Sequence, residues 1–253
     1  QSNSVLKGNC GAASSESSVT WKLTQNNEGS ENPTYTLTIS GSGDMADYES
    51  PTNTASSSIA PWYIWKDSIN KLEIKSGVSA IGAYAFYGLE ELQTVTFEGT
   101  TLETLGDFSF ACYSEELTSF EFPSSVKDLG RWALSLPGIT TLAIPTSLKT
   151  IEECALTNCT GLTAFTVAKD NTAFTVDNGA LFGTVDGSKT LIAYPIANNA
   201  TSYSIPEGTT VIGAYAFNGA GNLTTITIPS TVTTLQTKAF QNTGLTSISI
   251  PNT

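Results

Sequence analysis

The sequence predicts a mostly β solenoid of about six to seven coils behind a strand-rich N-terminal cap. Two observations lead to this fold class. The hexapeptide IGAYAF occurs at 81–86 and again, unchanged, at 212–217. Charged residues make up only 13% of the chain, and Thr, Ser, Gly and Asn are abundant, which favours strands and turns over helices. A hexapeptide that occurs twice is typical of a structural repeat, because active sites are rarely built from identical segments.

The repeat has a period of 22 to 24 residues, with one longer gap between 151 and 212. The period begins at an apolar residue, which is Ile81, Leu105, Leu129, Ile151, Ile212 or Leu235. A small residue follows four positions later, and a large one comes next: Phe86, Phe110, Leu134, Leu156, Phe217 or Phe240. Alternating residues then predict strands at 92–97, 117–122, 139–144, 162–167, 223–228 and 245–250. A coil this short cannot bury its own apolar face, so we expect the coils to stack.

Residues 1–70 do not follow the period, and we assign them to the N-terminal β-rich cap. The segments 18–24 and 34–40 alternate apolar and polar residues, which predicts a pair of hairpin strands. Trp62, Tyr63 and Trp65 supply aromatic area that can cover the first coil. The alternative is that these rings form a platform on which a sugar stacks.

Residues 71–253 form the predicted solenoid, with a degenerate coil or hairpin inserted at 168–204. Within the insertion, Asp186 and Gly187 lie between two apolar runs, which predicts a two-residue hairpin turn. The insertion is either an atypical coil with a projecting hairpin or a protrusion that binds a partner.

Both ends of the chain carry an expectation of their own. The chain begins at Gln1 without a Met, so we expect that a signal peptide has been removed. It stops at SISIPNT, directly after a predicted strand, without a polar cap. An uncapped coil presents unpaired backbone groups, which predicts self-association through this coil or a modest local rearrangement.

Composition excludes several classes of function. The net charge of -12, with only 11 Lys and Arg, disfavours nucleic-acid and anionic-membrane binding. No apolar run is long enough to insert into a membrane. The chain has no histidine, which removes Ser-His-Asp and Cys-His nucleophiles and most zinc sites.

No metal, cofactor or catalytic residue is expected. The cysteines Cys10, Cys112, Cys154 and Cys159 lack zinc-ligand spacing, and we expect free buried thiols, with a Cys154–Cys159 disulfide as the alternative. Adjacent acidic pairs such as Glu90-Glu91 fall at or near turns, where neighbouring carboxylates diverge into solvent. The chain is therefore not expected to be an enzyme, although two well-placed acids can suffice for a glycosidase.

The repeat pattern resembles a known family. The segments IPEGTTVIGAYAFNGAGNLTTITIP (205–229) and IPSTVTTLQTKAFQNTGLTSISIP (228–251) are similar to the BspA-like leucine-rich repeats of bacterial surface proteins. The resemblance covers about 71–253, and the order of segments in 1–70 also resembles the lead-in of this family. Glu152 and Gln236 depart from the pattern because they replace a Gly. The resemblance implies a right-handed leucine-rich repeat solenoid.

Two rows of side chains are candidate binding surfaces. The first consists of strand residues that point away from the core, on the presumed concave face. Its members are Thr94, Thr96, Ser119, Glu121, Thr141, Thr166, Thr225, Thr227, Ser247 and Ser249. This hydroxyl-rich face is either a docking surface for an extended protein or an ordinary solvated β-face.

The second row lies two residues before the large position and is rich in aromatic residues. Its aromatic members are Tyr84, Phe108, Trp132 and Tyr215, with Cys154 and Lys238 in the remaining coils. Stacked aromatic rings can bind sugars or partner side chains. The alternative is that they pack the turns of neighbouring coils against each other.

The resemblance implies a non-enzymatic bacterial protein that is secreted or held at the cell surface. Its expected partner is an extracellular protein, either of the host matrix or of a cell surface, and its expected role is adhesion. A carbohydrate-binding surface module and a passive structural spacer are the alternatives.

Overall fold

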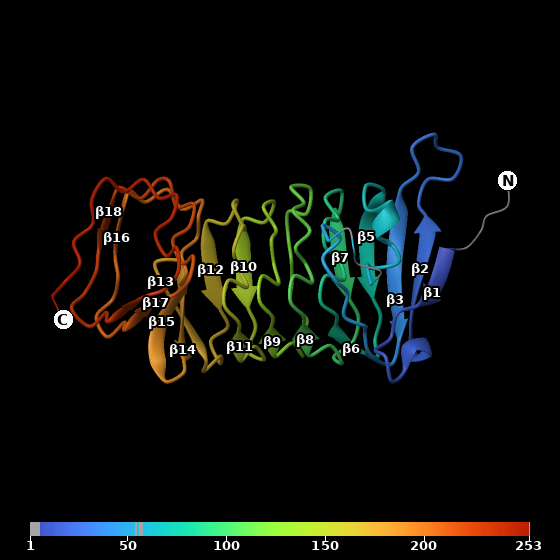
Figure 1. Ribbon diagram of the computed structural model, residues 1–253, viewed down its shortest axis with the longest axis horizontal. Helices are drawn as coiled ribbons and strands as arrows, with labels where there is room; N and C mark the ends of the chain where they lie inside the picture. Colours follow the sequence, from blue (N-terminus) through green and yellow to red (C-terminus); the bar gives the residue numbers. More distant parts are fainter. Residues whose placement is uncertain (1–5, 54, 56–57, 253) are drawn as a thin grey trace.

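The computed structural model describes residues 6–53, 55 and 58–252. It is an elongated, nearly all-β solenoid of about seven turns, whose coils stack along the long axis from one terminus to the other (Figure 1). The predicted fold class is therefore confirmed. In this part of the chain, the helical elements are two 3-10 turns, η1 (Glu16–Ser18) and η2 (Tyr63–Trp65).

The strands are short, and most of them contribute one side of one coil. In chain order they are β1 (Leu6–Asn9), β2 (Val19–Gln25), β3 (Tyr35–Gly41), β4 (Gly43–Asp44), β5 (Ile69–Ile74), β6 (Val78–Ile81), β7 (Thr94–Phe97), β8 (Thr104–Leu105), β9 (Asp128–Leu129), β10 (Thr141–Ile144), β11 (Thr150–Ile151), β12 (Ala164–Val167), β13 (Phe174–Asp177), β14 (Ala180–Val185), β15 (Ser188–Ala193), β16 (Ser202–Ser204), β17 (Val211–Ile212), β18 (Thr225–Thr227) and β19 (Thr234–Leu235).

The strands form two rows of sheets that run along the solenoid. The first row contains the sheet β1-β2-β3-β5-β7 and the pairs β10-β12 and β16-β18; we call its outer surface the strand face. The second row contains the sheets β11-β9-β8-β6-β4 and β13-β14-β15-β17-β19. Successive coils pair in parallel, as in Leu142 opposite Phe165, because a near-constant period brings equivalent residues into register.

The cap strands belong to the same sheet as the first repeats. The predicted hairpin is confirmed, because β2 and β3 pair antiparallel with Leu23 opposite Leu37. Strand β3 then pairs in parallel with β5, and β5 pairs with β7. The cap therefore extends the repeat sheet by hydrogen bonding.

Trp62 connects the cap to the first coil through a hydrogen bond and a ring contact. Its side chain is fully buried, and its indole N–H donates to the Ala85 carbonyl at 2.8 Å. Its ring stacks on Phe86 with the centroids 6.0 Å apart. Because no part of this ring reaches solvent, the interpretation of Trp62 as a sugar platform is wrong.

The columns of the repeat form the core. Phe86, Phe110 and Phe217 are fully buried, and the rings of Phe86 and Phe110 lie 5.1 Å apart. The small residues beside them, such as Ala85 and Ser109, are also buried. The buried residues divide into two clusters, which meet at the inserted strands β14 and β15.

The repeat glycines permit the coils to approach closely. A Cβ atom at Gly82 would overlap the Ala46 carbonyl of the neighbouring coil, and it would lie 3.1 Å from the Asp47 amide nitrogen. Gln236 occupies this position in the last repeat. Its Oε1 accepts a hydrogen bond from the Ala214 N–H at 3.0 Å, so the longer side chain bridges two coils.

Two of the predicted strands are wrong, since 117–122 and 245–250 are not strands in the structure. In 117–122, Phe120 is buried and packs edge to face on Phe97, so the segment contributes to the core without pairing as a strand. In 245–250, Ile248 and Ile250 are exposed, so burial does not hold this segment in register.

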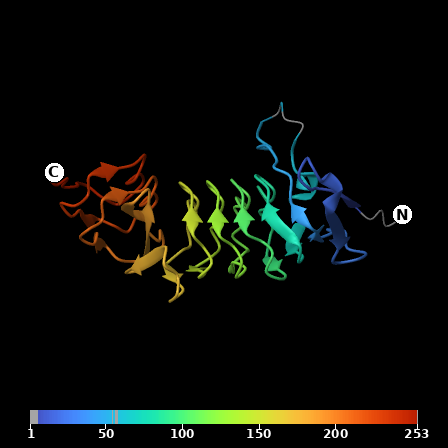
Figure 2. The same ribbon diagram turned by 90° about the horizontal axis from the view of Figure 1, so that it is seen from below.

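The insertion contains the predicted hairpin, which is confirmed. Strands β14 and β15 pair antiparallel around Asp186 and Gly187, whose φ angles of 48° and 77° are those of a type I′ turn. Strands β13 to β15 stand apart from the regular row of coils (Figure 2). Strand β15 pairs with β17, whereas β11 pairs only with β9 among the described strands, so the second row of sheets is interrupted here.

Candidate functional site

The strand face carries the first set of candidate residues. All ten predicted residues are exposed, from Thr94 at one end to Ser249 at the other. The alternation along each strand explains this, because Leu142 and Ile144 of β10 are buried while Thr141 and Ala143 point outward. The structure does not bring the ten residues into one unbroken array.

The strand face consists of three patches. Thr94 and Thr96 lie beside Lys71 and Glu73 of β5. Thr141 and Thr166 lie on the β10-β12 pair, and Thr225 and Thr227 lie opposite Ser202 and Ser204 on the β16-β18 pair. The unpaired segment 117–122, which carries Ser119 and Glu121, separates the first patch from the second. The insertion separates the second patch from the third.

The hydroxyl groups of the predicted candidates on this face make no side-chain hydrogen bonds within the fold. Within the described part of the chain, no side-chain hydrogen bond joins any of the nine Thr and Ser candidates to another residue. Other hydroxyls of the same strand segments behave differently. Thr163 Oγ1 donates to the Thr140 carbonyl at 2.9 Å, and Thr224 Oγ1 donates to the Thr201 carbonyl at 3.2 Å. The candidates therefore present unused donors and acceptors to solvent.

The cap contributes residues to this face that sequence analysis missed. Thr36 and Thr38 of β3 lie opposite Lys71 and Glu73 of β5, and these lie in turn opposite Thr94 and Thr96. The assignment of 1–70 to a separate cap does not predict that the sheet of the repeats continues into the cap strand β3. The alternation in INKLEI at 69–74 is the signal that could have revealed it.

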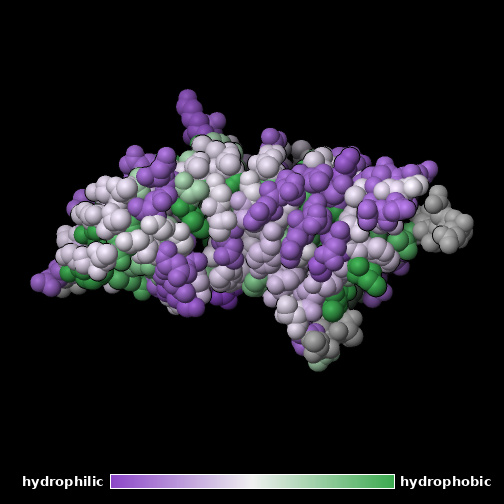
Figure 3. All heavy atoms as spheres, turned by 90° about the horizontal axis from the view of Figure 1, so that it is seen from above, coloured by the Kyte–Doolittle hydropathy of each residue, from purple (hydrophilic) through white to green (hydrophobic). Residues whose placement is uncertain are grey.

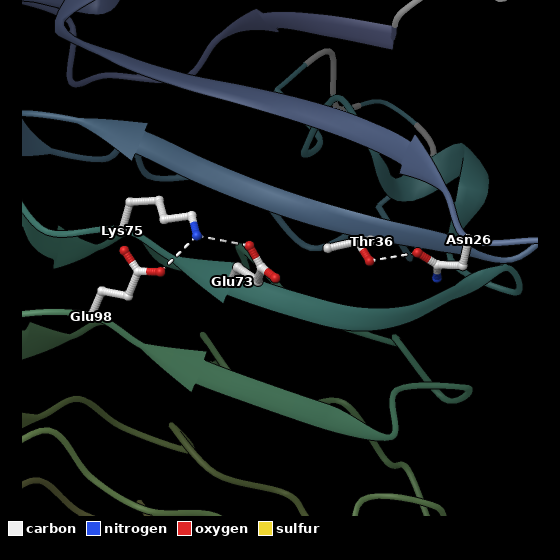
Figure 4. A network of polar contacts seen from close by, with 5 residues as sticks. All are labelled: Asn26, Thr36, Glu73, Lys75 and Glu98. Atoms are coloured by element: carbon white, nitrogen blue, oxygen red, sulfur yellow. Dashed lines mark hydrogen bonds and ion pairs between the residues drawn. The ribbon is translucent and has the colours of Figure 1, made fainter.

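A charged cluster marks the cap end of the strand face. Lys75 Nζ lies 2.6 Å from Glu98 Oε1 and 2.9 Å from Glu73 Oε2, so one ammonium group bridges two neighbouring strands (Figure 4). Hydrogen bonds to Glu98 and Glu73 raise the pKa of Lys75. Nearby, Thr36 Oγ1 donates to Asn26 Oδ1 at 2.7 Å. Seen from above, the molecule is mostly hydrophilic or neutral, with apolar groups in small separate areas (Figure 3).

The structure does bring the aromatic row together. The rings of Tyr84 and Phe108 are 4.7 Å apart and nearly parallel, and Trp132 continues the stack at 6.1 Å from Phe108. Trp132 meets Tyr215 edge to face at 5.2 Å, and the Lys238 ammonium lies 5.4 Å from the Tyr215 ring centre. All four aromatic residues are half-buried.

The backbone of this row is unusual in a way that sequence analysis missed. Tyr84, Phe108, Trp132, Cys154, Tyr215 and Lys238 all have φ between 52° and 61°. This left-handed conformation costs roughly 1–2 kcal/mol for a residue other than Gly. The row places Phe108 between the parallel rings of Tyr84 and Trp132, and Tyr215 meets Trp132 edge to face. Stacking between coils therefore covers the ring faces of Phe108, on which a sugar would otherwise stack.

All four cysteines are free, and the expectation of free buried thiols is met by three of them. Cys10, Cys112 and Cys159 are buried, whereas Cys154 is half-buried. Burial raises the pKa of Cys159 from 9.0 to about 11 and that of Cys10 to about 12. These thiols stay protonated at neutral pH, which makes them poor nucleophiles.

The comparisons with known proteins agree with this architecture. The BspA type leucine rich repeat region matches residues 61–181 and 193–253, in six copies. A leucine-rich repeat protein from Eubacterium ventriosum is 27% identical in sequence, with a TM-score of 0.70. The match covers 93% of this chain and 63% of that protein, so the chain spans less than two thirds of its relative.

Two further solved structures share the fold. The pneumococcal vaccine antigen PcpA is 21% identical, with a TM-score of 0.60, and the match covers 100% of this chain and 71% of that one. A leucine-rich repeat protein from Bacteroides ovatus is 19% identical, with a TM-score of 0.50, over 91% of this chain and 58% of that one. No match was found among curated proteins.

Over residues 6–53, 55 and 58–252, no helix has the length and apolar character needed to cross a bilayer.

Proposed function

Because the chain belongs to the BspA-type leucine-rich repeat family, we propose that it is a non-enzymatic bacterial binding protein that is secreted or displayed at the cell surface. Its strand face binds an extracellular protein, and the biological outcome is adhesion to host or cell-surface proteins. The pneumococcal vaccine antigen PcpA, which shares the fold, supports this role by analogy at the level of fold.

The unused hydroxyl groups of the strand face carry the proposal. Hydroxyls within a fold normally bond to backbone, as Thr163 and Thr224 do. The candidates on the strand face make no such bonds within the described residues, so a partner can use them without disrupting the solenoid. Thr and Ser side chains are also short, which lets an extended or flat protein surface approach the strands closely.

The charges beside this face indicate how a partner would be oriented. Lys71 and the cluster around Lys75 lie at the cap end, whereas Glu121 is the acidic candidate further along the array. The chain as a whole carries a net charge of -12. Charge complementarity mainly sets orientation and association rate, so we expect binding to weaken as salt is raised.

The carbohydrate alternative is less well supported by the geometry. Trp62 is buried, and the aromatic row uses its ring faces for stacking between coils. A passive spacer would need no exposed groups that bind a partner. The binding experiment described next tests this alternative as well.

Biolayer interferometry tests the proposal directly. The chain is presented to immobilised host matrix proteins, serum proteins, mucin and deglycosylated mucin. We expect saturable binding to a protein, unchanged by deglycosylation and lowered at least tenfold by Thr141→Lys with Thr166→Lys. The matched control, Thr160→Lys with Thr175→Lys, adds the same charge at exposed positions outside the ten candidates.

Two results would contradict the proposal. Binding that disappears with the glycans, and with Trp132→Ala or Tyr215→Ala, would assign the site to the aromatic row. No binding to any immobilised target would favour the passive spacer.

A further inference from the structure

A cleft of about 480 Å³ opens where the second row of sheets is interrupted. The coil that contains β11 forms one wall, through residues such as Thr150 and Glu152. The hairpin forms another wall, through Thr184 and Asp186. Figure 1 shows β14 beside β11 at the lower edge of the solenoid. The volume lies within the roughly 300–1,000 Å³ of ligand-binding pockets.

The β11 side of this cleft has backbone groups without partners. In the preceding coil, the Lys127 carbonyl accepts from the Lys149 N–H at 2.8 Å, and the Leu129 carbonyl accepts from the Glu152 N–H at 3.0 Å. The equivalent carbonyls of β11 belong to Lys149 and Ile151. No described residue donates to either of them, since β11 pairs only with β9.

The same coil also has an unused backbone donor. The N–H groups of Tyr84 and Phe108 each donate to the following coil at 2.9 Å. Cys154 is their equivalent, and its N–H has no acceptor among the described residues. Cys154 also lines the cleft. The free edge of β11 therefore offers two acceptors, the carbonyls of Lys149 and Ile151, at the spacing that a neighbouring coil would otherwise use. The Cys154 N–H lies in the turn that follows β11 and, like the Trp132 N–H, has no backbone acceptor among the described residues.

The charges of the cleft select the side chains of an occupant. Three carboxylates and one ammonium group line it: Glu152, Glu153, Asp186 and Lys149. Glu153 is already paired, with Arg131 at 2.6 Å. The other three groups, Glu152, Asp186 and Lys149, leave an excess of one negative charge. The net charge of the whole chain is also strongly negative. A basic side chain complements this field.

We propose that the cleft binds an extended polypeptide segment carrying a Lys or Arg side chain, which adds to the free edge of β11 as an additional strand. Main-chain hydrogen bonds to β11 supply affinity, and Glu152 with Asp186 holds the basic side chain. The segment takes the place of the coil that the hairpin displaces. This site lies on the second row of sheets, so it is independent of the strand face.

The test begins with a displayed library of random heptapeptides, selected on the whole chain. Enriched peptides are synthesised with blocked ends, and their affinity is measured by fluorescence anisotropy. We expect enriched peptides to contain Lys or Arg and to lack Pro in their central residues, because Pro cannot donate to a strand. Methylation of alternate backbone nitrogens of the peptide, on the edge that pairs with β11, should lower its affinity for the chain at least tenfold.

Variants of the cleft locate the binding. Glu152→Gln with Asp186→Asn removes two charges and keeps a residue that tolerates φ of 48° at the turn. We expect it to weaken peptide binding at least fivefold. The matched control, Glu90→Gln with Glu207→Gln, removes two exposed carboxylates outside the cleft and should leave affinity unchanged. Thr184→Trp fills the cleft and should abolish binding, whereas Thr175→Trp on β13 should not.

Cys154 provides an independent readout. It is the half-buried cysteine, whereas the other three are buried, and it lines the cleft. A bound peptide should slow its alkylation, while Thr141→Lys with Thr166→Lys on the strand face should leave this protection unchanged. The proposal is overturned if the library yields no enriched peptide. It is also overturned if the cleft variants leave peptide affinity unchanged and bound peptides do not slow the alkylation of Cys154.

Discussion

Serine and threonine hydroxyls have three different environments in this protein. Those of the strand face point to solvent, as at Thr141. Others bridge coils, as where Ser125 Oγ donates to the Leu102 carbonyl at 2.6 Å. Ser109 belongs to neither class, because it occupies the small core column and its hydroxyl has no partner among the described residues. Residue type alone therefore does not reveal what a hydroxyl does here.

Replacing Ser109 with Ala should stabilise the protein. The substitution removes a buried hydroxyl that makes no hydrogen bond among the described residues. It also gives this coil the same small residue that the next coil has at the equivalent position, Ala133. We expect the free energy of unfolding to rise by about 1 kcal/mol, measured by urea denaturation. Ser114→Ala is the control, because that hydroxyl donates to the Leu92 carbonyl at 2.6 Å and its loss should destabilise. A loss of stability in Ser109→Ala would contradict the argument.

The buried thiols predict a loss of stability at alkaline pH. The pKa of Cys159 rises from 9.0 to about 11 on folding because burial disfavours the thiolate. Unfolded thiols ionise near pH 9 while folded ones remain protonated, so stability is constant below about pH 8 and falls between about pH 9 and 11.

Guanidinium denaturation between about pH 7 and 9.5 measures this slope before the tyrosines contribute. Cys10→Ala with Cys159→Ala should flatten it. A variant that keeps the wild-type slope would show that other groups cause the pH dependence.

At the scale of the element, the spacing between coils is set by residues that lack a side chain. Gly82 faces the carbonyl of Ala46 across a gap too narrow for a Cβ atom. The columns of small and large residues then fill the interior of the coil at the same spacing. At 117–122 the strand ladder stops, although Phe120 still packs on Phe97 of the preceding coil.

A methyl group at Gly82 should therefore separate two coils. We expect Gly82→Ala to lower the free energy of unfolding by about 3 kcal/mol through overpacking, measured by thermal denaturation followed by circular dichroism. Gly221→Ala is the matched control, since the nearest atom to its Cβ would be 3.9 Å away. The two variants would differ little if backbone flexibility, and not the close approach, were the reason for Gly82.

At the scale of the whole molecule, the buried residues form two clusters. One cluster of buried residues contains the cap and the first coils, and a smaller one contains the last coils. They meet at the insertion, where the second row of sheets is interrupted. Repeat proteins gain stability from contacts between neighbours, so an interruption divides the array into parts of unequal stability.

We expect the smaller cluster to unfold first. The four tryptophans are Trp21, Trp62, Trp65 and Trp132, which all precede the insertion. Trp132 contacts Tyr215 of the last coils, so the measurement uses Trp132→Phe, which leaves the three tryptophans of the cap. Its tryptophan fluorescence should report a higher denaturation midpoint than far-ultraviolet circular dichroism, which reports on both parts. Phe240→Trp places a reporter beside the smaller cluster and should reveal the earlier transition. Coincident midpoints for all probes would mean that the solenoid unfolds as one unit.

The sequence by itself determined the repeat and its consequences. A fixed period places identical residue types one above another, so the core columns, the outward rows and the hairpin at Asp186 follow from local pattern. The ten exposed candidates on the strand face follow for the same reason, because alternation in a strand assigns each side chain to one face. Their partner remains a proposal.

Only the tertiary structure decided how the coils meet. The joining of the cap to the repeat sheet through β3 and β5, the unpaired segment 117–122, and the cleft beside β11 depend on distances between coils. Close approaches such as that of Gly82 to Ala46, and the course of the inserted hairpin, contribute to those distances. The left-handed backbone at Trp132 recurs at its equivalents Cys154 and Lys238, which carry no aromatic ring, so it belongs to the turn of the repeat and not to ring stacking.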